Sequence, residues 1–499
     1  MRVLLIQPSM IVSERWSYKA EPFLPVGLGL IASVLREANH EVKIVDALTE
    51  GWEKRWRLEG NWIEIGLAEE DVAAEVREFR PHVVGFSIPL TSQLPRVRSL
   101  ARWVKAIHPE IFVICGGNHP TAAPRDMLEI PEMDLVVLGE SEAVLPQALD
   151  RLANNQELDD LAGVAYREIE GGIAINPISD YSEDLDSLPL PAYDLLPLKK
   201  YFKITGKRSI PFFTSRGCKN QCAYCTTRQH AGKSVRQFSP QYLLKQIRHL
   251  IEYYGVREFF FDDHGLFLDK TYTKSFFKAL QESKLKIQWH ARNGINPCVL
   301  EDDLLDTLKK SGCKRLYFNP DSGSRRILSR CLSKPYNPFV TEQSIQRTLR
   351  SGIKVSCQFI LGSPGESMDE IYETLNFAWK LRNMGVDQFN FDLAVPYIGT
   401  KLRKLAEKKN CLLPYPDQMY TPDDALMSTE QLDAADLIRI RDTAEREFNS
   451  RGLVVGLKSR RFNTTKQSAV TEDRIFYSVA PQPYLTSRKL KPALAKNPA

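Results

Sequence analysis

The sequence has few histidines and cysteines for its length and no long hydrophobic run. Its 499 residues include 9 cysteines and 8 histidines, and no apolar stretch approaches the roughly 18 residues that a membrane-spanning helix needs. The first residues become polar too soon for a secretory signal peptide. Together these absences predict a cytoplasmic protein without a membrane span.

Two further absences narrow the function. No G-x-G-x-x-G follows the first predicted strand, where Gln7-Pro8-Ser9-Met10 stands instead, so an ordinary dinucleotide site has no support. The net charge is only +5. Residues 456–499 carry nine Lys and Arg against two Asp and Glu, a net +7, which leaves the rest of the chain at −2. We therefore expect no nucleic-acid partner, and a basic, loosely ordered tail at 456–499.

Three of the nine cysteines stand close together. Cys218, Cys222 and Cys225 have the spacing C-x₃-C-x₂-C, which chance would produce in roughly three of a thousand such chains. Three thiolates can bind three irons of a cubane iron–sulfur cluster, which takes four when it is fully closed. One iron then lacks a protein ligand, and chemistry is expected at such an open position. The motif predicts a catalytic iron–sulfur centre.

A structural zinc site is the main alternative for these cysteines. It would need a fourth ligand and usually a second C-x₂-C hook. The sequence has no second hook, and the nearest histidine is His230. The remaining cysteines are scattered singly and are interpreted as reduced residues, mostly in the core.

Residues 1–154 alternate short apolar runs with amphipathic stretches. The expected strands cover 3–7, 42–45, 82–86, 112–115 and 135–138, and the expected helices cover 27–38, 68–79, 92–107 and 141–153. This rhythm predicts a doubly wound, Rossmann-like α/β sheet, which binds ligands at the carboxyl ends of its strands. The loops expected at those ends are 8–25, 87–94, 116–121 and 139–142.

A second region repeats the alternation of strand and helix. The expected strands cover 210–214, 258–262, 286–290, 315–318, 354–361 and 388–395, with helices near 240–254, 270–282, 302–311, 341–351 and 368–385. Six such units predict a whole or partial parallel barrel, in which chemistry sits at the carboxyl ends of the strands. The cysteine motif directly follows the first of these strands and so lies at the catalytic end.

These patterns divide the chain into five parts. We expect a Rossmann-like domain at 1–155, a hairpin and Pro-rich linker at 156–204, the partial barrel at 205–400, a helical C-terminal segment at 401–455 and the tail at 456–499.

Polar residues are expected at the ends of the barrel strands. A cationic ligand that resembles an amino acid needs a carboxylate for its ammonium and a cation for its carboxylate. The candidates are Asp262, Arg292, Asp321, Ser322, Gly362 and Glu366, together with Tyr224 on the cysteine motif. Each could instead be an ordinary cap, turn or surface group, and Tyr224 could be a packed aromatic residue.

With an aromatic residue at 224, the cysteine motif resembles that of the radical S-adenosylmethionine (SAM) superfamily. In that family the open iron of a 4Fe–4S cluster chelates the amine and carboxylate of SAM, and an electron from the cluster cleaves the sulfonium. Gly362-Ser-Pro-Gly-Glu366 is similar to the fifth-strand motif of the family. Asn319-Pro-Asp-Ser-Gly stands where the family usually has Gly-Ile-Glu-Ser-Gly, a departure at Pro320 and Asp321. The resemblance implies that the seven candidates above contact SAM.

The N-terminal region resembles the domain that binds cobalamin in the cobalamin-dependent class of this superfamily. The resemblance rests on Pro25-Val-Gly-Leu-Gly-Leu, Val45-Asp-Ala, Gly116-Gly-Asn-His-Pro-Thr and Gly139-Glu-Ser-Glu. It implies cobalamin contacts from Ser87, Gly116, Gly117, His119, Thr121, Gly139 and Glu140. No D-x-H-x-x-G run is present, so the resemblance implies a cobalt without an axial histidine.

The resemblance implies an enzyme that uses a 4Fe–4S cluster, SAM and cobalamin. The expected reaction is methyl transfer to an unactivated carbon of a small-molecule biosynthetic intermediate through a 5′-deoxyadenosyl radical. One alternative is cyclisation, oxidation or rearrangement without methylation. Another is a sensor or carrier that binds corrinoid or cluster without catalysis. An external electron donor of the flavodoxin or ferredoxin type is the expected protein partner.

Overall fold

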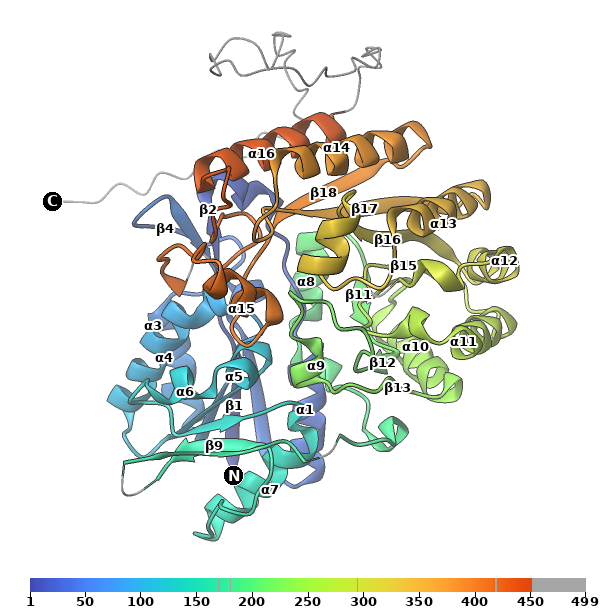
Figure 1. The fold of residues 1–499 in the computed structure, drawn as a ribbon. Helices are drawn as coiled ribbons and strands as arrows, with labels where there is room; N and C mark the ends of the chain where they lie inside the picture. The colour runs from blue at the N-terminus through green and yellow to red at the C-terminus, as the bar shows by residue number, and fades with distance from the viewer. Residues whose placement is uncertain (169–170, 180, 294, 418–419, 451–499) are drawn as a thin grey trace, which may run out of the picture. The chain divides into compact units, whose positions relative to one another are not determined.

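A computed structural model of the chain describes residues 1–168, 171–179, 181–293, 295–417 and 420–450. The predicted tail at 456–499 lies outside the described residues. Two large sheets organise this part of the chain, one from each predicted α/β region (Figure 1). No helix in it is both long and apolar enough to cross a membrane.

The first large sheet contains the five predicted parallel strands. They are β1 (Arg2–Gln7), β3 (Glu41–Asp46), β6 (Val83–Ser87), β7 (Phe112–Gly116) and β8 (Leu135–Val137). Their order across the sheet is β3-β1-β6-β7-β8. This doubly wound order changes direction between β1 and β6, and such switch points bind ligands. The predicted fold of this region is confirmed.

Helices cover both faces of this sheet. The long ones are α1 (Val26–Glu37), α3 (Glu69–Phe79), α4 (Leu94–Ile107) and α7 (Ser141–Ala153), and the short ones are α2 (Ala47–Glu50), α5 (Asn118–Ala122) and α6 (Pro124–Leu128). Successive residues of β1 enter different cores, since Leu5 packs in one hydrophobic cluster and Leu4 and Ile6 in another. The strands are continuously apolar because both faces are buried.

Two antiparallel additions extend this region. The hairpin of β9 (Val164–Arg167) and β10 (Ile173–Asn176) pairs with β8 and continues the first sheet. A separate small sheet joins β2 (Met10–Ser13), β5 (Trp62–Ile65) and β4 (Arg55–Leu58). Part of the segment that was expected to be a loop, 8–25, is therefore a strand.

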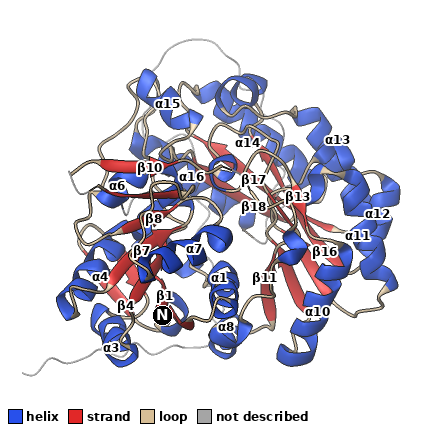
Figure 2. Cartoon of the chain, turned by 90° about the horizontal axis from the view of Figure 1, so that it is seen from below, coloured by secondary structure: helices blue, strands red, loops and turns tan. Residues whose placement is uncertain are grey.

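The second large sheet has six parallel strands in sequential order. They are β11 (Ser209–Phe212), β14 (Glu258–Phe261), β15 (Gln288–Ala291), β16 (Cys313–Asp321), β17 (Lys354–Leu361) and β18 (Gln388–Leu393). Among the described residues no pairing joins β18 to β11, so this is the predicted partial barrel. Its helices are α10 (Pro240–Tyr254), α11 (Lys270–Glu282), α12 (Asp302–Lys310), α13 (Pro338–Arg350) and α14 (Met368–Asn383). Figure 2 shows α10 to α13 along the outside of this sheet.

The predicted helical C-terminal segment protects the last barrel strand. Helix α16 (Ala434–Asn449) packs on β18, where the Glu445 carboxylate accepts from the Phe391 N–H at 2.6 Å and the Asn449 amide pairs with both backbone groups of Phe389. These bonds satisfy edge groups that would otherwise be open. Apart from short 3₁₀ turns, the other described elements are α8 (Leu198–Thr205), β12 (Ser215–Arg216), α9 (Thr227–His230), β13 (Arg236–Gln237), a π-helical turn (Ile327–Cys331) and α15 (Lys401–Lys408).

Candidate functional site: a cysteine loop and an adjoining cavity

The segment that carries Cys218, Cys222 and Cys225, which we call the cysteine loop, follows β11 and is held in place at its start. The buried carboxylate of Asp263, just past β14, accepts from the backbone N–H of Thr214 at 2.9 Å and from the N–H and hydroxyl of Ser215 at 2.6 and 2.7 Å. Burial raises the pKa of Asp263 to about 7, although these donors oppose the rise. The loop is thus anchored to the neighbouring strand three residues before Cys218.

The three cysteines differ in exposure. Cys218 and Cys222 are half-buried, and Cys225 is exposed. Burial raises the pKa of Cys222 to about 11, and the positive charge of Lys334 opposes this rise. A thiolate at Cys222 therefore needs a cationic ligand such as an iron ion to stabilise it.

The arrangement of the three cysteines bears on the choice between a cluster and a single metal ion. Within the described ranges, no three His, Cys, Asp or Glu side chains are arranged to hold one metal ion together. A cubane cluster makes a different demand, because each thiolate binds its own iron. Cys218, Cys222 and Cys225 can therefore serve a cluster without converging on one point.

Tyr224 and Asp321, two of the predicted SAM residues, meet beside the cysteines. The Tyr224 hydroxyl donates to Asp321 Oδ2 at 3.0 Å, and Lys334 Nζ lies 2.7 Å from the same oxygen. Asp321 has a φ of 60° where the pairing of β16 with β17 becomes irregular, which turns its carboxylate toward the cysteine loop. Lys334 was not predicted, since nothing around it in the sequence marks a buried cation.

Three other predicted SAM residues support the backbone. The Ser322 hydroxyl is bonded to Thr374 Oγ1 at 2.9 Å. Glu366 accepts the N–H groups of Gly362 and Ser363 through Oε2 at 2.7 and 2.9 Å. Glu366 Oε1 has no hydrogen-bond partner in the described part of the chain, and burial raises the pKa of this carboxyl to about 8. The two Glu366 bonds shape the turn after β17, and the Ser322 bond ties the end of β16 to α14.

Asp262 and Arg292, the remaining predicted SAM residues, pair with each other. Arg292 Nε donates to Asp262 Oδ1 at 2.7 Å, and its Nη2 bonds to the other carboxylate oxygen. The guanidinium also lies over the ring of Phe260, 4.5 Å from its centroid. In the described part of the chain, neither side chain forms a hydrogen bond or ion pair with the cysteine loop, so the structure does not bring all the candidates together.

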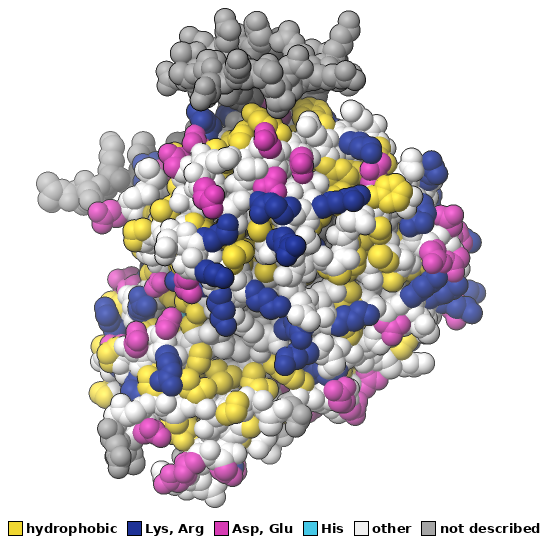
Figure 3. Space-filling view, viewed as in Figure 1, with side chains coloured by type: hydrophobic (Ala, Val, Ile, Leu, Met, Phe, Trp, Pro, Cys, Tyr) yellow, Lys and Arg dark blue, Asp and Glu magenta, His cyan; other side chains and the backbone are white. Residues whose placement is uncertain are grey.

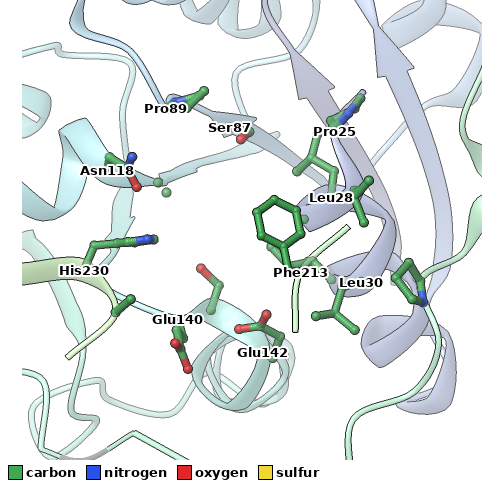
Figure 4. Close-up of a pocket in the computed structure, with 18 of the residues that line it drawn as sticks. Pro25, Leu28, Leu30, Ser87, Pro89, Asn118, Glu140, Glu142, Phe213 and His230 are labelled. Atoms are coloured by element: carbon green, nitrogen blue, oxygen red, sulfur yellow. The ribbon is translucent and has the colours of Figure 1, made fainter. Parts of the chain in front are cut away.

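A cavity of about 430 Å³ opens at the carboxyl ends of the first sheet (Figure 4). Five of the seven predicted cobalamin residues line it: Ser87, Gly116, Gly117, Gly139 and Glu140. At two of these positions the backbone conformation and the close neighbours require glycine. Gly117 has a φ of 115° and a Cβ there would lie 2.9 Å from the Ile88 carbonyl oxygen, whereas Gly139 has a φ of 70° and a Cβ would lie 2.8 Å from Ile178. The apolar wall includes Leu28 and Phe213.

The other two predicted cobalamin residues hold the loops that form this cavity. Thr121 donates to the Gly117 carbonyl at 2.8 Å and accepts from the Gly139 N–H at 2.9 Å. His119 Nδ1 is bonded to Thr91 Oγ1 at 3.0 Å, and burial lowers the pKa of His119 to about 4. Neither is among the residues that line the cavity.

Ion pairs join the cavity to the cysteine loop. Glu140 pairs with Arg216 at 3.0 Å and with Arg236 at 2.6 Å, and Arg216 also pairs with Glu142 at 2.5 Å. Burial would raise the pKa of Glu142, but the Arg216 guanidinium holds it below its ordinary value. Because Arg216 lies two residues before Cys218, the cavity and the cysteine loop share a wall. Neither arginine was predicted, since such pairing depends on how the two regions fold together.

Two histidines bring unpartnered nitrogen atoms to this cavity. His230 ends α9 and His264 follows β14, with ring centroids 5.7 Å apart. Both line the cavity, and Nδ1 of each is buried with no hydrogen-bond partner among the residues that the structure describes. Burial lowers the pKa of each to about 4, so both are neutral at pH 7. A corrin ring, apolar at its faces and ringed by amides, suits a cavity with apolar walls and free imidazole nitrogens.

Comparisons with known proteins match this architecture. Residues 20–149 match the sequence model of the B12 binding domain, and residues 212–378 match that of the radical SAM superfamily. An uncharacterized methyltransferase of Pyrococcus horikoshii, PH0819, is 31% identical over 435 residues, covering 86% of this chain and 89% of the relative. The chain belongs to the B12-binding radical SAM family.

Two further proteins resemble the chain over most of its length. The cytidylyl-2-hydroxyethylphosphonate methyltransferase of Streptomyces wedmorensis is 28% identical over 90% of each chain. The solved structure of the radical SAM methyltransferase TsrM from Kitasatospora setae, with cobalamin and a 4Fe–4S cluster bound, covers 83% of this chain and 76% of its own, at 15% identity and a TM-score of 0.64. Family membership confirms the predicted enzyme class and its cofactors, a 4Fe–4S cluster, SAM and cobalamin.

Proposed function

We propose that this chain transfers a methyl group from SAM, by way of cobalamin, to an unactivated carbon of a small-molecule biosynthetic intermediate. The proposal rests on the wall that the cavity and the cysteine loop share. Arg216 pairs with Glu140 and Glu142 at the cavity, and Cys218 follows two residues later. A corrin in the cavity would therefore lie next to the cluster site, as consecutive steps on one substrate require.

When bound, the cluster and SAM supply a radical that removes hydrogen from the substrate, and cobalamin supplies the methyl group. The chain's own residues would hold and shield these groups. Cys218, Cys222 and Cys225 would hold three irons, and the Asp321–Lys334 pair offers a carboxylate and an ammonium for the two charged ends of SAM's amino-acid part. The apolar cavity wall would exclude water from the corrin face.

We propose no substrate more specific than a small molecule. In the described part of the chain, the segment after the barrel strands packs on β18 and on the cysteine loop through α16 and α15. It offers no pattern that identifies one chemical class. We also propose that an external one-electron donor reduces the cluster, and that the chain has no nucleic-acid partner.

The first transfer can be tested without knowing the substrate. Anaerobically reconstituted enzyme with reduced cobalamin is incubated with SAM labelled with ¹³C in its methyl group, and the extracted corrinoid is analysed by mass spectrometry. The expected result is label on the corrinoid together with 5′-deoxyadenosine under reducing conditions. 5′-Deoxyadenosine without label would favour a cyclisation or oxidation, whereas neither product would favour a sensor or carrier.

A further inference from the structure

Basic side chains surround the exposed end of the cysteine loop. They come from three segments: 217–234, which holds the cysteines and α9; 324–334, which holds the π-helical turn; and 400–410, which holds α15. Together these segments carry twelve Lys and Arg and a single carboxylate of their own, that of Glu407. Three of the twelve, Lys334, Arg326 and Lys409, are paired with carboxylates that lie outside the segments. The whole chain is nearly balanced, with 67 Lys and Arg against 62 Asp and Glu. We call the three segments the basic collar.

The three segments of the basic collar are in direct contact. The Ala223 N–H donates to the Leu332 carbonyl at 2.8 Å, and the Leu402 N–H donates to the Ala223 carbonyl at 2.8 Å. Lys401 Nζ bonds to Gln221 Oε1 at 3.0 Å. Lys and Arg side chains accordingly gather on one face of the molecule, over α15, α9 and the π-helical turn (Figure 3). The charge is concentrated around the middle of the C-x₃-C-x₂-C motif.

Much of this charge is available to a partner. Lys404, Lys408 and Arg330 are exposed, and none of them forms an ion pair with another described residue. The one carboxylate, Glu407, is already paired with Arg403 at 2.7 Å. Cys225 reaches the same surface, so a cluster held by the loop would have one edge close to solvent.

We propose that the basic collar is the docking surface for a small acidic electron-transfer protein. This inference rests on the proposed function, because it needs a redox cluster on the cysteine loop. One electron leaves the reduced flavin or iron–sulfur centre of the donor and lowers the oxidation state of the cluster by one. No covalent bond forms or breaks in that transfer. Opposite charges on the two proteins speed their association and orient the donor toward Cys225.

The test compares two charge-neutralised variants with two kinds of donor. The first variant is Lys404→Gln, Lys408→Gln, Arg330→Gln on the basic collar. The second is Lys245→Gln, Arg248→Gln, Lys286→Gln, three exposed residues on or near the outer barrel helices that form no ion pair with another described residue. Reduced flavodoxin and reduced ferredoxin are the acidic protein donors, and reduced methyl viologen is a small cationic donor. The rate of 5′-deoxyadenosine formation and the bleaching of the cluster are both measured.

The collar variant should lose about tenfold or more in its rate with at least one protein donor at low salt, while the methyl viologen rate stays within about twofold of the parent. The parent rate with that donor should fall as salt rises, and the collar variant should lose most of that dependence. Binding of the oxidised donor, measured by calorimetry, should weaken in parallel. The control variant should behave as the parent does.

Equal rates for the two variants with both protein donors would overturn the inference. So would an equal slowing of the collar variant with methyl viologen, because the lost charge would then act on the cluster itself. If the parent makes no 5′-deoxyadenosine with any donor, the proposed function fails first, and calorimetry then decides whether the collar binds an acidic protein.

Discussion

Lys334 Nζ lies 2.7 Å from Asp321 Oδ2 in the interior beside the cysteine loop. The Lys334 side chain is 10% exposed and that of Asp321 is 1% exposed, so each charge depends on the other. The Tyr224 hydroxyl completes the group by donating to the same oxygen at 3.0 Å. A buried pair of this kind contributes little net free energy to folding. The loss of one partner, however, is strongly destabilising, because the other remains charged and unpaired.

Breaking this pair from one side should therefore destabilise the protein. Lys334→Met or Asp321→Asn is expected to lower the free energy of unfolding by about 3 kcal/mol, whereas the double variant should regain much of that loss. Urea denaturation of the cofactor-free protein measures all four species of the cycle. Lys310→Met provides the control, since its pair with Asp306 is more than half exposed on both sides and should contribute under about 1 kcal/mol. Additive single effects would contradict a direct coupling.

If the three cysteines hold the cluster, replacing any of them should disable the cluster site and leave the cobalamin site intact. Cys218→Ala, Cys222→Ala or Cys225→Ala should each abolish 5′-deoxyadenosine formation and the visible absorption of the reconstituted cluster, while cobalamin still binds. The reason is that each thiolate serves one iron and no spare ligand stands in the motif. Cys298→Ala replaces an exposed cysteine elsewhere and should change nothing. Parent-level turnover in any of the three variants would refute the assignment.

Glu366 should make stability depend on pH near neutrality. Its pKa is raised by burial from 4.5 to about 8, so the folded state keeps a proton that the unfolded chain has released. The folded state binds more protons in this window, and the free energy of unfolding falls as pH rises, by about 1.4 kcal/mol per pH unit for this group. Glu366→Gln keeps an acceptor for Gly362 and Ser363 and removes the titration. Its advantage over the parent should grow from about pH 5.5 to about pH 7.5 in urea denaturation.

Glu370, four residues on, is the matched control for this experiment. Burial would raise its pKa, but Arg326 and the Ser367 N–H hold the pKa at about 2. Glu370→Gln should thus lower stability by a constant amount across the same pH range. If Glu366→Gln shows the same flat difference, its carboxyl titrates normally in the folded protein.

The sequence predicted the architecture because periodic burial is a local signal. Helices α10 and α11 have the predicted bounds, as their apolar faces recur at the helical spacing. The strand pairing β2-β5-β4 was not predicted, because each of its strands is only four residues long and all of β4 is exposed.

The site was predictable in part for the same reason. Cysteine spacing and strand-end glycines are local, and the structure places both where ligands can reach them. Glu140 shows the limit, because it lines the cavity as predicted while its charge is paired with Arg216 and Arg236. Those arginines follow Glu140 by 76 and 96 residues, and only tertiary packing brings them together. Lys334 could not be predicted for the same reason, because only tertiary packing brings it to Asp321.

The unpartnered imidazoles make the cobalamin proposal testable through binding alone. His230→Leu and His264→Leu should each weaken the affinity for hydroxocobalamin about fivefold, because each removes one hydrogen bond from a buried nitrogen to a corrin amide. Their pKa values near 4 mean that affinity should not change between about pH 6 and about pH 8. Equilibrium dialysis measures the constant without turnover. His108→Leu alters an exposed histidine and should have no effect, whereas His264→Asn, which keeps a polar atom near Nδ1, should restore part of the affinity. Unchanged binding in both leucine variants would place the corrin elsewhere in the cavity.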